Sequence, residues 1–294
     1  MPELHVGPRT LRPVHADGEQ QPYNHLGIQP LSPTIGAELT GVDLGHDLAD
    51  EAIAEVRRAL LEYKVIFFRD QRISTEQHLA FARRFGDLET HPFAPRKAGY
   101  PEVLLLEKNE RMGGFENVWH SDVTWRLEPS LGSVLRACTV PDVGGDTLFC
   151  DMYAAYEGLD DDVRASLDGL RAVHDFTHTF GRLLDADALA RKQKEFPPAA
   201  HPVVRTHPET HRKALYVNAA FTSHVVGLPR DESKQLLDLL YRQATVPEYQ
   251  CRFHWRPDSI AFWDNRAVQH YAVSDYWPQR RVMERVTIIG DTPA

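Results

Sequence analysis

Apolar residues in the first quarter of the chain follow two different periods. Residues 49–64, ADEAIAEVRRALLEYK, predict an amphipathic helix, because their apolar positions recur at helical spacing. The positions that carry this pattern are Ile53, Val56, Leu60 and Leu61. The run VIFFRDQ at 65–71 follows at once and predicts a buried strand.

Two neighbouring segments carry signals for element ends. Residues 74–86, STEQHLAFARRFG, predict a second helix with Ser74 as its cap, Gln77 at the capping-box position and Gly86 as its stop. Residues 35–44, IGAELTGVDL, alternate like a strand and contain turn glycines.

Strand-like runs dominate after residue 119. They are GSVLRACTV, GDTLFCDM, KALYVN, CRFHW, SIAFWDN and RVMERVTIIG. Two helices are expected between them, at 154–170 and 230–244. Strands and helices do not alternate regularly, which argues against a parallel doubly wound sheet. The pattern favours a mainly β fold, an antiparallel barrel or jelly roll with flanking helices.

Composition narrows the class of protein. The 294 residues are 42% hydrophobic and carry a formal charge of −9, which argues against a general nucleic-acid binder. No apolar run approaches a membrane span, no signal peptide is evident, and three scattered cysteines suit a reduced, cytoplasmic setting. We expect a loose polar tail at 1–25 and a single domain at 26–294.

The stretch WHSDVTW places His120 two residues before Asp122. In a chain with 15 histidines, one such pair is a weak signal. A second His-x-Asp, His15 to Asp17, falls in the polar tail, and the related His207–Glu209 falls in an expected hairpin turn. We interpret both of these as structural.

The surroundings of His120 and Asp122 differ from those of the other pairs. On a strand, residues i and i+2 point to the same face, so both side chains could grip one ion. Two tryptophans, Trp119 and Trp125, supply an apolar setting. Far downstream, His270 could complete a triad of two histidines and one carboxylate, which leaves open positions on Fe(II).

The segment RRVMERVTII alternates sharply. One face carries Val282, Glu284, Val286 and Ile288, and the other carries Arg281, Met283, Arg285 and Thr287. If the second face lines the barrel, its two arginines are costly unless they meet anions, which suggests two acidic ligands. A protein carboxylate as partner, or a solvated face, fits this pattern equally well.

Five segments taken together resemble the taurine dioxygenase family of Fe(II)/2-oxoglutarate-dependent dioxygenases. They are WHSDVTW, GGDTLF, HPVVRTHPETHRKALYVN, WDNRAVQHYAVSDY and RRVMERVTIIGD. The resemblance runs in order over about residues 35–293. It implies a double-stranded β-helix, also called a jelly roll, with Fe(II) as metal and 2-oxoglutarate as co-substrate.

The resemblance also implies a role for each matching residue. The iron would be bound by His120, Asp122 and His270. The far carboxylate of 2-oxoglutarate would be held by Thr147 and Arg281. The substrate pocket would comprise His91, Val123, Phe180, Phe221 and Arg285, with Arg285 and His91 binding the anionic head.

The implied reaction hydroxylates the carbon next to the sulfonate of taurine or a related sulfonate, using O2 and releasing sulfite and an aldehyde. Three positions depart from the taurine pattern: Ala94, Glu116 and Glu284. A smaller side chain and an extra negative charge could change substrate choice. Alkylsulfate-ester or aryloxyalkanoate oxidation is the alternative within the family.

Two alternatives lie outside the family. One is a non-catalytic metal-binding jelly-roll protein, and the other is a zinc hydrolase with the same three ligands. The paired arginines and the lack of an evident general base make the hydrolase the weaker alternative. We expect a small anionic substrate, no nucleic-acid or membrane partner, and a homo-oligomer, either a dimer or a tetramer.

Overall fold

The computed structural model describes residues 7–14, 21–114 and 116–294, and its largest element is an eight-stranded sheet. In spatial order the strands are β1 (Gly27–Pro30), β2 (Ala37–Thr40), β3 (Val65–Phe68), β14 (Ile260–Asp264), β6 (Ser130–Thr139), β16 (Arg281–Ile289), β5 (Tyr100–Lys108) and β4 (Arg96–Lys97). All neighbours pair antiparallel except β2 with β3.

A second sheet of three antiparallel strands packs against the inner face of the main sheet. Its strands are, in order, β13 (Gln250–Phe253), β7 (Thr147–Asp151) and β15 (Val268–Ala272). Phe67 of the main sheet stacks on Phe253 at 3.9 Å between ring centroids, and Phe149 meets Trp263 at 5.8 Å. Two sheets that are antiparallel except for the pair β2–β3, packed around one core, confirm the predicted jelly roll.

Alternation along the strands sends side chains to two different cores. In β3, Val65 and Phe67 belong to the core between the sheets, whereas Ile66 and Phe68 belong to the core under the helices. The same alternation in β16 places Met283 between the sheets and Val286 on the helical side. The inward face of β16 is therefore the one that carries the two arginines.

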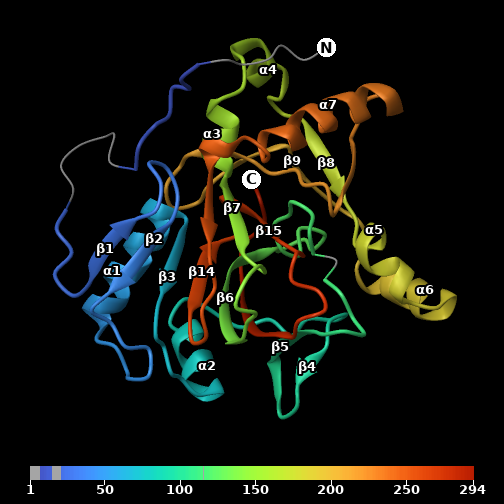
Figure 1. Ribbon diagram of the computed structural model, residues 1–294. Helices are drawn as coiled ribbons and strands as arrows, with labels where there is room; N and C mark the ends of the chain where they lie inside the picture. Colours follow the sequence, from blue (N-terminus) through green and yellow to red (C-terminus); the bar gives the residue numbers. More distant parts are fainter. Residues whose placement is uncertain (1–6, 15–20, 115) are drawn as a thin grey trace.

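Helices α1 (Asp50–Tyr63) and α2 (Thr75–Arg83) cover the outer face of the main sheet (Figure 1). Both were predicted, and the capping box is confirmed: the Gln77 N–H donates to Ser74 Oγ at 3.2 Å and the Ser74 N–H donates to Gln77 Oε1 at 2.6 Å. The helix ends three residues before Gly86. Gly36 (φ 86°) and Gly41 (φ 83°) flank β2, so the expected turn glycines are also confirmed.

The helix expected at 154–170 is wrong as one element. The structure has α3 (Met152–Glu157) and α4 (Asp161–Ser166) instead. Asp151 caps α3, and Gly158 ends it where a Cβ would collide with the Tyr249 hydroxyl. The other expected helix is present as α7 (Arg230–Gln243).

The remaining elements lie around one end of the jelly roll. A small sheet contains β12 (Thr222–Val225), β8 (Arg171–His174) and β9 (Ala199–Pro202), and β10 (Val204–Thr206) pairs with β11 (Lys213–Leu215) as the expected hairpin. Two short 3-10 turns are η1 (Gly181–Leu183) and η2 (Pro247–Tyr249). Helices α5 (Thr177–Phe180) and α6 (Ala186–Glu195) project from the body at the right of Figure 1.

The described parts of the N-terminal segment contact the jelly roll. Val14 N–H donates to the Pro33 carbonyl at 3.1 Å, and Arg9 reaches the Tyr249 hydroxyl at 3.3 Å. These contacts tie parts of the segment to the body, and the expectation of a loose tail at 1–25 stays a prediction. The pair His15 and Asp17 lies outside the described residues.

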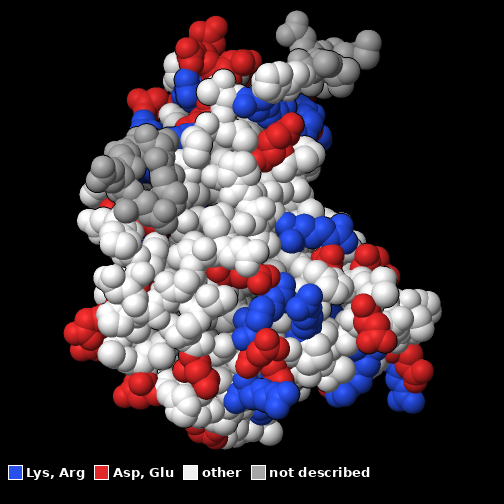
Figure 2. Space-filling view, turned by 60° about the vertical axis from the view of Figure 1, so that its left-hand side comes forward, with Lys and Arg blue, Asp and Glu red and all other residues white. Residues whose placement is uncertain are grey.

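Two further features are the placement of charged side chains on the surface and the length of the helices. On the face shown in Figure 2, basic and acidic side chains lie interspersed rather than gathered into one large patch of a single sign. Among the described residues, every helix is too short or too polar to cross a membrane.

Candidate active site

The stretch WHSDVTW is not a strand, so the reason given for the convergence of His120 and Asp122 is wrong. His120 forms an isolated bridge with His270, and Asp122 begins a turn in which Val123 has φ 47°. The backbone N–H of Asp122 bonds to the Asn265 side chain rather than to a neighbouring strand. A turn, not strand alternation, brings the two side chains together.

The three predicted ligand side chains nevertheless converge. Asp122 Oδ1 lies 3.8 Å from His120 Nε2 and 3.9 Å from His270 Nε2. One ligand atom from each residue lies within 4.8 Å of the other two. An ion about 2.0–2.2 Å from each atom needs only small side-chain movements to fit between them.

Hydrogen bonds select which imidazole nitrogen of His120 faces the centre. His120 Nδ1 lies 2.8 Å from the Val118 carbonyl, which can only accept, so Nδ1 carries the proton. The Nε2 lone pair is therefore free to face a metal, as metal-binding histidines require. Reciprocal backbone bonds of 3.1 and 2.8 Å hold His120 against His270.

Arg285 compensates the charge of Asp122. Its Nη1 lies 2.7 Å from Asp122 Oδ1, and Ser133 Oγ donates to Oδ2 at 3.1 Å. Burial acts to raise the pKa of Asp122, but Arg285 and the two histidines outweigh it and lower this pKa below its ordinary value. Asp122 is thus an anion in a buried site, which is the state that binds a cation.

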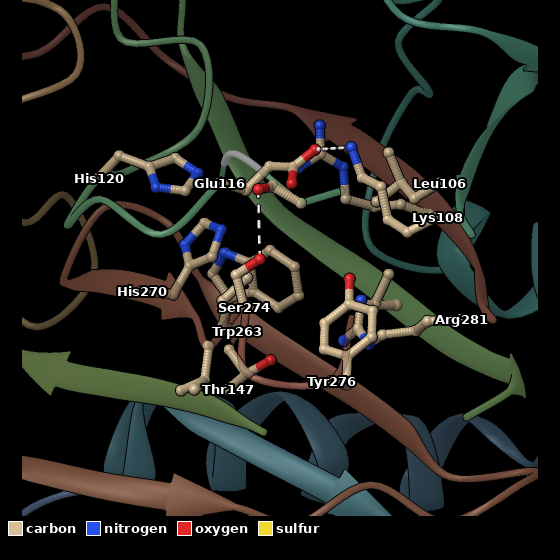
Figure 3. A pocket seen from close by; sticks show the side chains of 15 residues that line it. Leu106, Lys108, Glu116, His120, Thr147, Trp263, His270, Ser274, Tyr276 and Arg281 are labelled. Atoms are coloured by element: carbon tan, nitrogen blue, oxygen red, sulfur yellow. Dashed lines mark hydrogen bonds and ion pairs between the residues drawn. The ribbon is translucent and has the colours of Figure 1, made fainter. Parts of the chain in front are cut away.

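A cavity of about 60 Å³ lies beside the histidines and ends at Arg281 and Thr147. Figure 3 shows His120 and His270 on one side of this cavity and Arg281 with Tyr276 on the other. Arg281 is 6% exposed, and among the described residues its Nε has no hydrogen-bond partner. Thr147 Oγ1 accepts from Trp255 Nε1 at 2.9 Å, which leaves the hydroxyl proton for another acceptor. An anion in this cavity would satisfy both groups.

A second cavity, of about 360 Å³, opens from the triad toward the surface. Arg285 and His91 stand at its inner end. His91 Nδ1 accepts from the N–H groups of Phe93 and Ala94 at 3.2 and 3.1 Å, so the proton is on Nε2. Burial, assisted by Arg285, lowers the pKa of His91 to about 3. The neutral His91, through its Nε2–H, and the Arg285 guanidinium can therefore bind the same anion.

The rest of this second cavity is largely apolar. Its lining includes the predicted residues Val123, Phe180 and Phe221. The other apolar residues of the lining are Phe93, Ala94, Pro95, Leu104, Leu105, Leu106, Met112, Val118 and Leu183. Met112 and Leu183, at 50% and 60% exposure, extend this apolar wall to the surface. All ten predicted site residues thus lie at the triad or in these two cavities.

Sequence reasoning missed Lys108, which lines both cavities beside Glu116. Its Nζ lies 2.7 Å from Glu116 Oε1 (Figure 3). Glu116, one of the three positions that depart from the taurine pattern, therefore reaches the site. Its negative charge is compensated by Lys108. Ala94 also lines the larger cavity, so its small side chain leaves space there. No spacing signal in the sequence marks Lys108.

The third departure, Glu284, lies outside both cavities. It is 5% exposed on the helical side of β16, where Lys97 Nζ lies 2.5 Å from its carboxylate. The His207–Glu209 pair, which we interpret as structural, has partners elsewhere. His207 bonds to Asp264 at 3.0 Å, and Glu209 pairs with Arg266 at 2.9 Å. These contacts bear out the structural interpretation of that pair.

Comparison with known proteins agrees with this geometry. Residues 27–287 match the model of the taurine catabolism dioxygenase TauD, TfdA family. The chain is 35% identical to the alkylsulfatase of Acinetobacter baylyi, over 92% of this chain and 87% of that protein. It is 36% identical to an alpha-ketoglutarate-dependent sulfate ester dioxygenase of Pseudomonas putida, over 91% of each. A crystal structure of a taurine dioxygenase from Burkholderia xenovorans superposes with a TM-score of 0.81 at 40% identity, covering 92% of this chain and 91% of that one.

Proposed function

The chain belongs to the TauD, TfdA family and is an Fe(II)- and 2-oxoglutarate-dependent dioxygenase, and from this premise we propose that His120, Asp122 and His270 hold its iron. When bound, iron and 2-oxoglutarate use O2 to insert an oxygen atom into a substrate C–H bond, with succinate and CO2 as co-products. Two nitrogens and one carboxylate oxygen are the donors of this class of iron site.

The smaller cavity fits the far carboxylate of 2-oxoglutarate. Arg281 offers a buried guanidinium with an unsatisfied N–H, and Thr147 offers a hydroxyl proton. Burial acts to lower the pKa of Arg281, and Tyr276 opposes that effect. An anionic partner would offset the cost of this buried cation.

The larger cavity takes the primary substrate, which we propose is an alkyl sulfate ester with an extended apolar tail. The apolar wall running from the triad to Met112 and Leu183 carries this proposal. Taurine would place its ammonium near that wall, where Glu116 is already paired with Lys108 and Glu107 with Arg280. Two relatives with about 90% coverage act by name on sulfate esters.

The residues of the larger cavity would orient this substrate for hydroxylation of the carbon that bears the ester oxygen. Arg285 and the Nε2 proton of His91 hold the sulfate, and the apolar wall excludes water around the tail. Hydroxylation of the carbon bearing the ester oxygen gives a species in which that carbon carries both a hydroxyl and the sulfate. The C–O bond to sulfate then breaks, the hydroxyl loses its proton, and an aldehyde and inorganic sulfate leave. A sulfonate would break its C–S bond and yield sulfite instead.

Specificity should rise with the length of the alkyl tail. Each methylene buried against the wall contributes ~0.8 kcal/mol, or roughly fourfold in kcat/KM. Succinate, sulfate and sulfite should be measured for butyl, hexyl and octyl sulfate, hexanesulfonate, taurine and phenoxyacetate. We expect octyl sulfate to be turned over best and to release sulfate.

The mouth of the cavity offers a matched pair of variants. Leu183→Asp should flatten the dependence on chain length, whereas Leu127→Asp, at a 67% exposed leucine outside the cavity lining, should leave it intact. Preference for taurine over every longer substrate, or activity on phenoxyacetate alone, would contradict the proposal. Turnover of hexanesulfonate above hexyl sulfate would shift it to sulfonates with apolar tails.

A further inference from the structure

Asn265 holds the backbone of Asp122 from both sides. It follows β14 and is fully buried. Its Oδ1 accepts from the Asp122 N–H at 2.7 Å, and its Nδ2 donates to the Asp122 carbonyl at 2.9 Å and to the Ser130 carbonyl at 3.3 Å. The opposite amide orientation would set donor against donor, so these contacts fix the side chain in one orientation.

The turn that Asn265 holds is a costly one. Val123 adopts φ 47°, a region that β-branched residues rarely enter and that costs about 1–3 kcal/mol. Within the turn, the Arg126 N–H donates to the Val123 carbonyl at 3.0 Å. The bonds from Asn265 come from a different part of the chain and fix the residue just before the strained one.

The same segment also delivers a histidine to the site. Asn265 stands in the connection from β14 to β15, and His270 lies within β15. His270 is tied to His120 by reciprocal backbone bonds. The connection that carries the chain from β14 in the main sheet to β15 in the second sheet thus sets the positions of all three triad residues, two through backbone pairing and the third through an amide side chain.

We propose that Asn265 is a positioning residue, which sets the backbone of Asp122 so that its Oδ1 meets the two histidine nitrogens. This inference rests on the proposed iron-binding role of the triad and not on the identity of the substrate. The contacts of Ser133 and Arg285 are separate, because these side chains hold the carboxylate oxygens. Asn265 fixes the direction in which the carboxylate leaves the main chain.

Gln71 provides a matched control for loss of a backbone clamp. It is 7% exposed, accepts from the Leu44 N–H at 2.8 Å and donates to the Arg69 carbonyl at 2.9 Å. Asn265→Ala, Asn265→Asp and Gln71→Ala should be compared by Mn(II) titration, Co(II) absorption and thermal unfolding. Asn265→Asp keeps the acceptor for the Asp122 N–H and loses the donor to its carbonyl.

We expect Asn265→Ala to weaken Mn(II) binding ~10–100-fold and to alter the Co(II) spectrum. The Mn(II) affinity of Asn265→Asp should fall between those of Asn265→Ala and the wild type. If Asn265→Ala does not fold, Asn265→Asp is the variant that tests the inference. Gln71→Ala should lower the unfolding midpoint while Mn(II) affinity stays within about twofold. Wild-type Mn(II) affinity in both Asn265 variants, with lowered unfolding midpoints, would overturn the inference.

The iron-site assignment fails by a different result. If His270→Ala binds Mn(II) as well as the wild type does, the triad is not the metal site and the proposed function falls. If His270→Ala loses Mn(II) and the Asn265 variants do not, only the positioning role of Asn265 is lost.

Discussion

His270→Ala is expected to bind Fe(II) or Mn(II) at least ~100-fold more weakly than the wild type and to produce no succinate above background. The change removes one of three donors and leaves Asp122 and His120 without the third side of the site. Anaerobic metal titration followed by addition of O2 and 2-oxoglutarate measures both effects. A variant that binds metal and turns over normally would refute the triad.

His78→Ala is the matched control for this variant. His78 is buried like His270, but it belongs to α2 on the helical side of the main sheet, where its Nε2 lies 3.0 Å from the Val134 carbonyl. It should lose stability and keep its metal affinity. Zinc in place of iron should support no turnover in the wild type, whereas activity with zinc would favour the hydrolase alternative.

The second large effect separates the two arginines of β16. Arg281→Ala should raise the KM for 2-oxoglutarate about 10–100-fold, because a charge-assisted bond to a buried anion contributes ~1.5–3 kcal/mol. The affinity for the primary substrate should change little. Arg285→Ala should show the reverse pattern, since Arg285 lines the larger cavity beside His91.

The structure adds a condition to that experiment. Arg285 also contacts Asp122, so its removal should weaken metal binding, and metal affinity must be measured separately for each variant. Titrations with 2-oxoglutarate and with octyl sulfate under anaerobic, metal-saturated conditions then give four comparable affinities. Equal losses of both ligands in both variants would contradict separate roles.

The arginines show where sequence pattern is informative. Strand β16 is covered on both faces, so its side-chain alternation translates directly into two environments, and Arg281 and Arg285 fall on the inner one. Helices α1 and α2 were predictable for a similar reason: each buries one stripe against the sheet. A regular spacing of apolar residues, buried on one side, identifies the type of element and the face that it buries.

Other parts of the site left no such trace. The turn at Asp122 depends on Asn265, a residue far away in sequence, so local alternation suggested a strand instead. Helix α5 has only four residues, too few to show a helical repeat, and α6 has a single large apolar residue, Leu189, which is only partly buried. The ion pair of Lys108 with Glu116 joins the end of β5 to a loop, and neither the residue types nor their spacing predicts it.

The domain boundary at residue 26, a homo-oligomeric assembly and a cytoplasmic location stay predictions. The resemblance to the family, by contrast, correctly indicated the jelly roll and the dioxygenase class. The ten residues that the resemblance assigns to the site all lie at the triad or in the two cavities. The proposed variants test their chemical roles.

The bridge between His120 and His270 also has a consequence for how the protein is made. Strands distant in sequence pair with each other throughout the fold, as β3 does with β14 and β7 with β15, so its contact order is high and folding is expected to be slow. A growing chain that has displayed only His120 and Asp122 presents two donors and no Asn265. The proposed iron site is therefore complete only once β14 and β15 have joined their separate sheets, and we expect metal loading to follow that step.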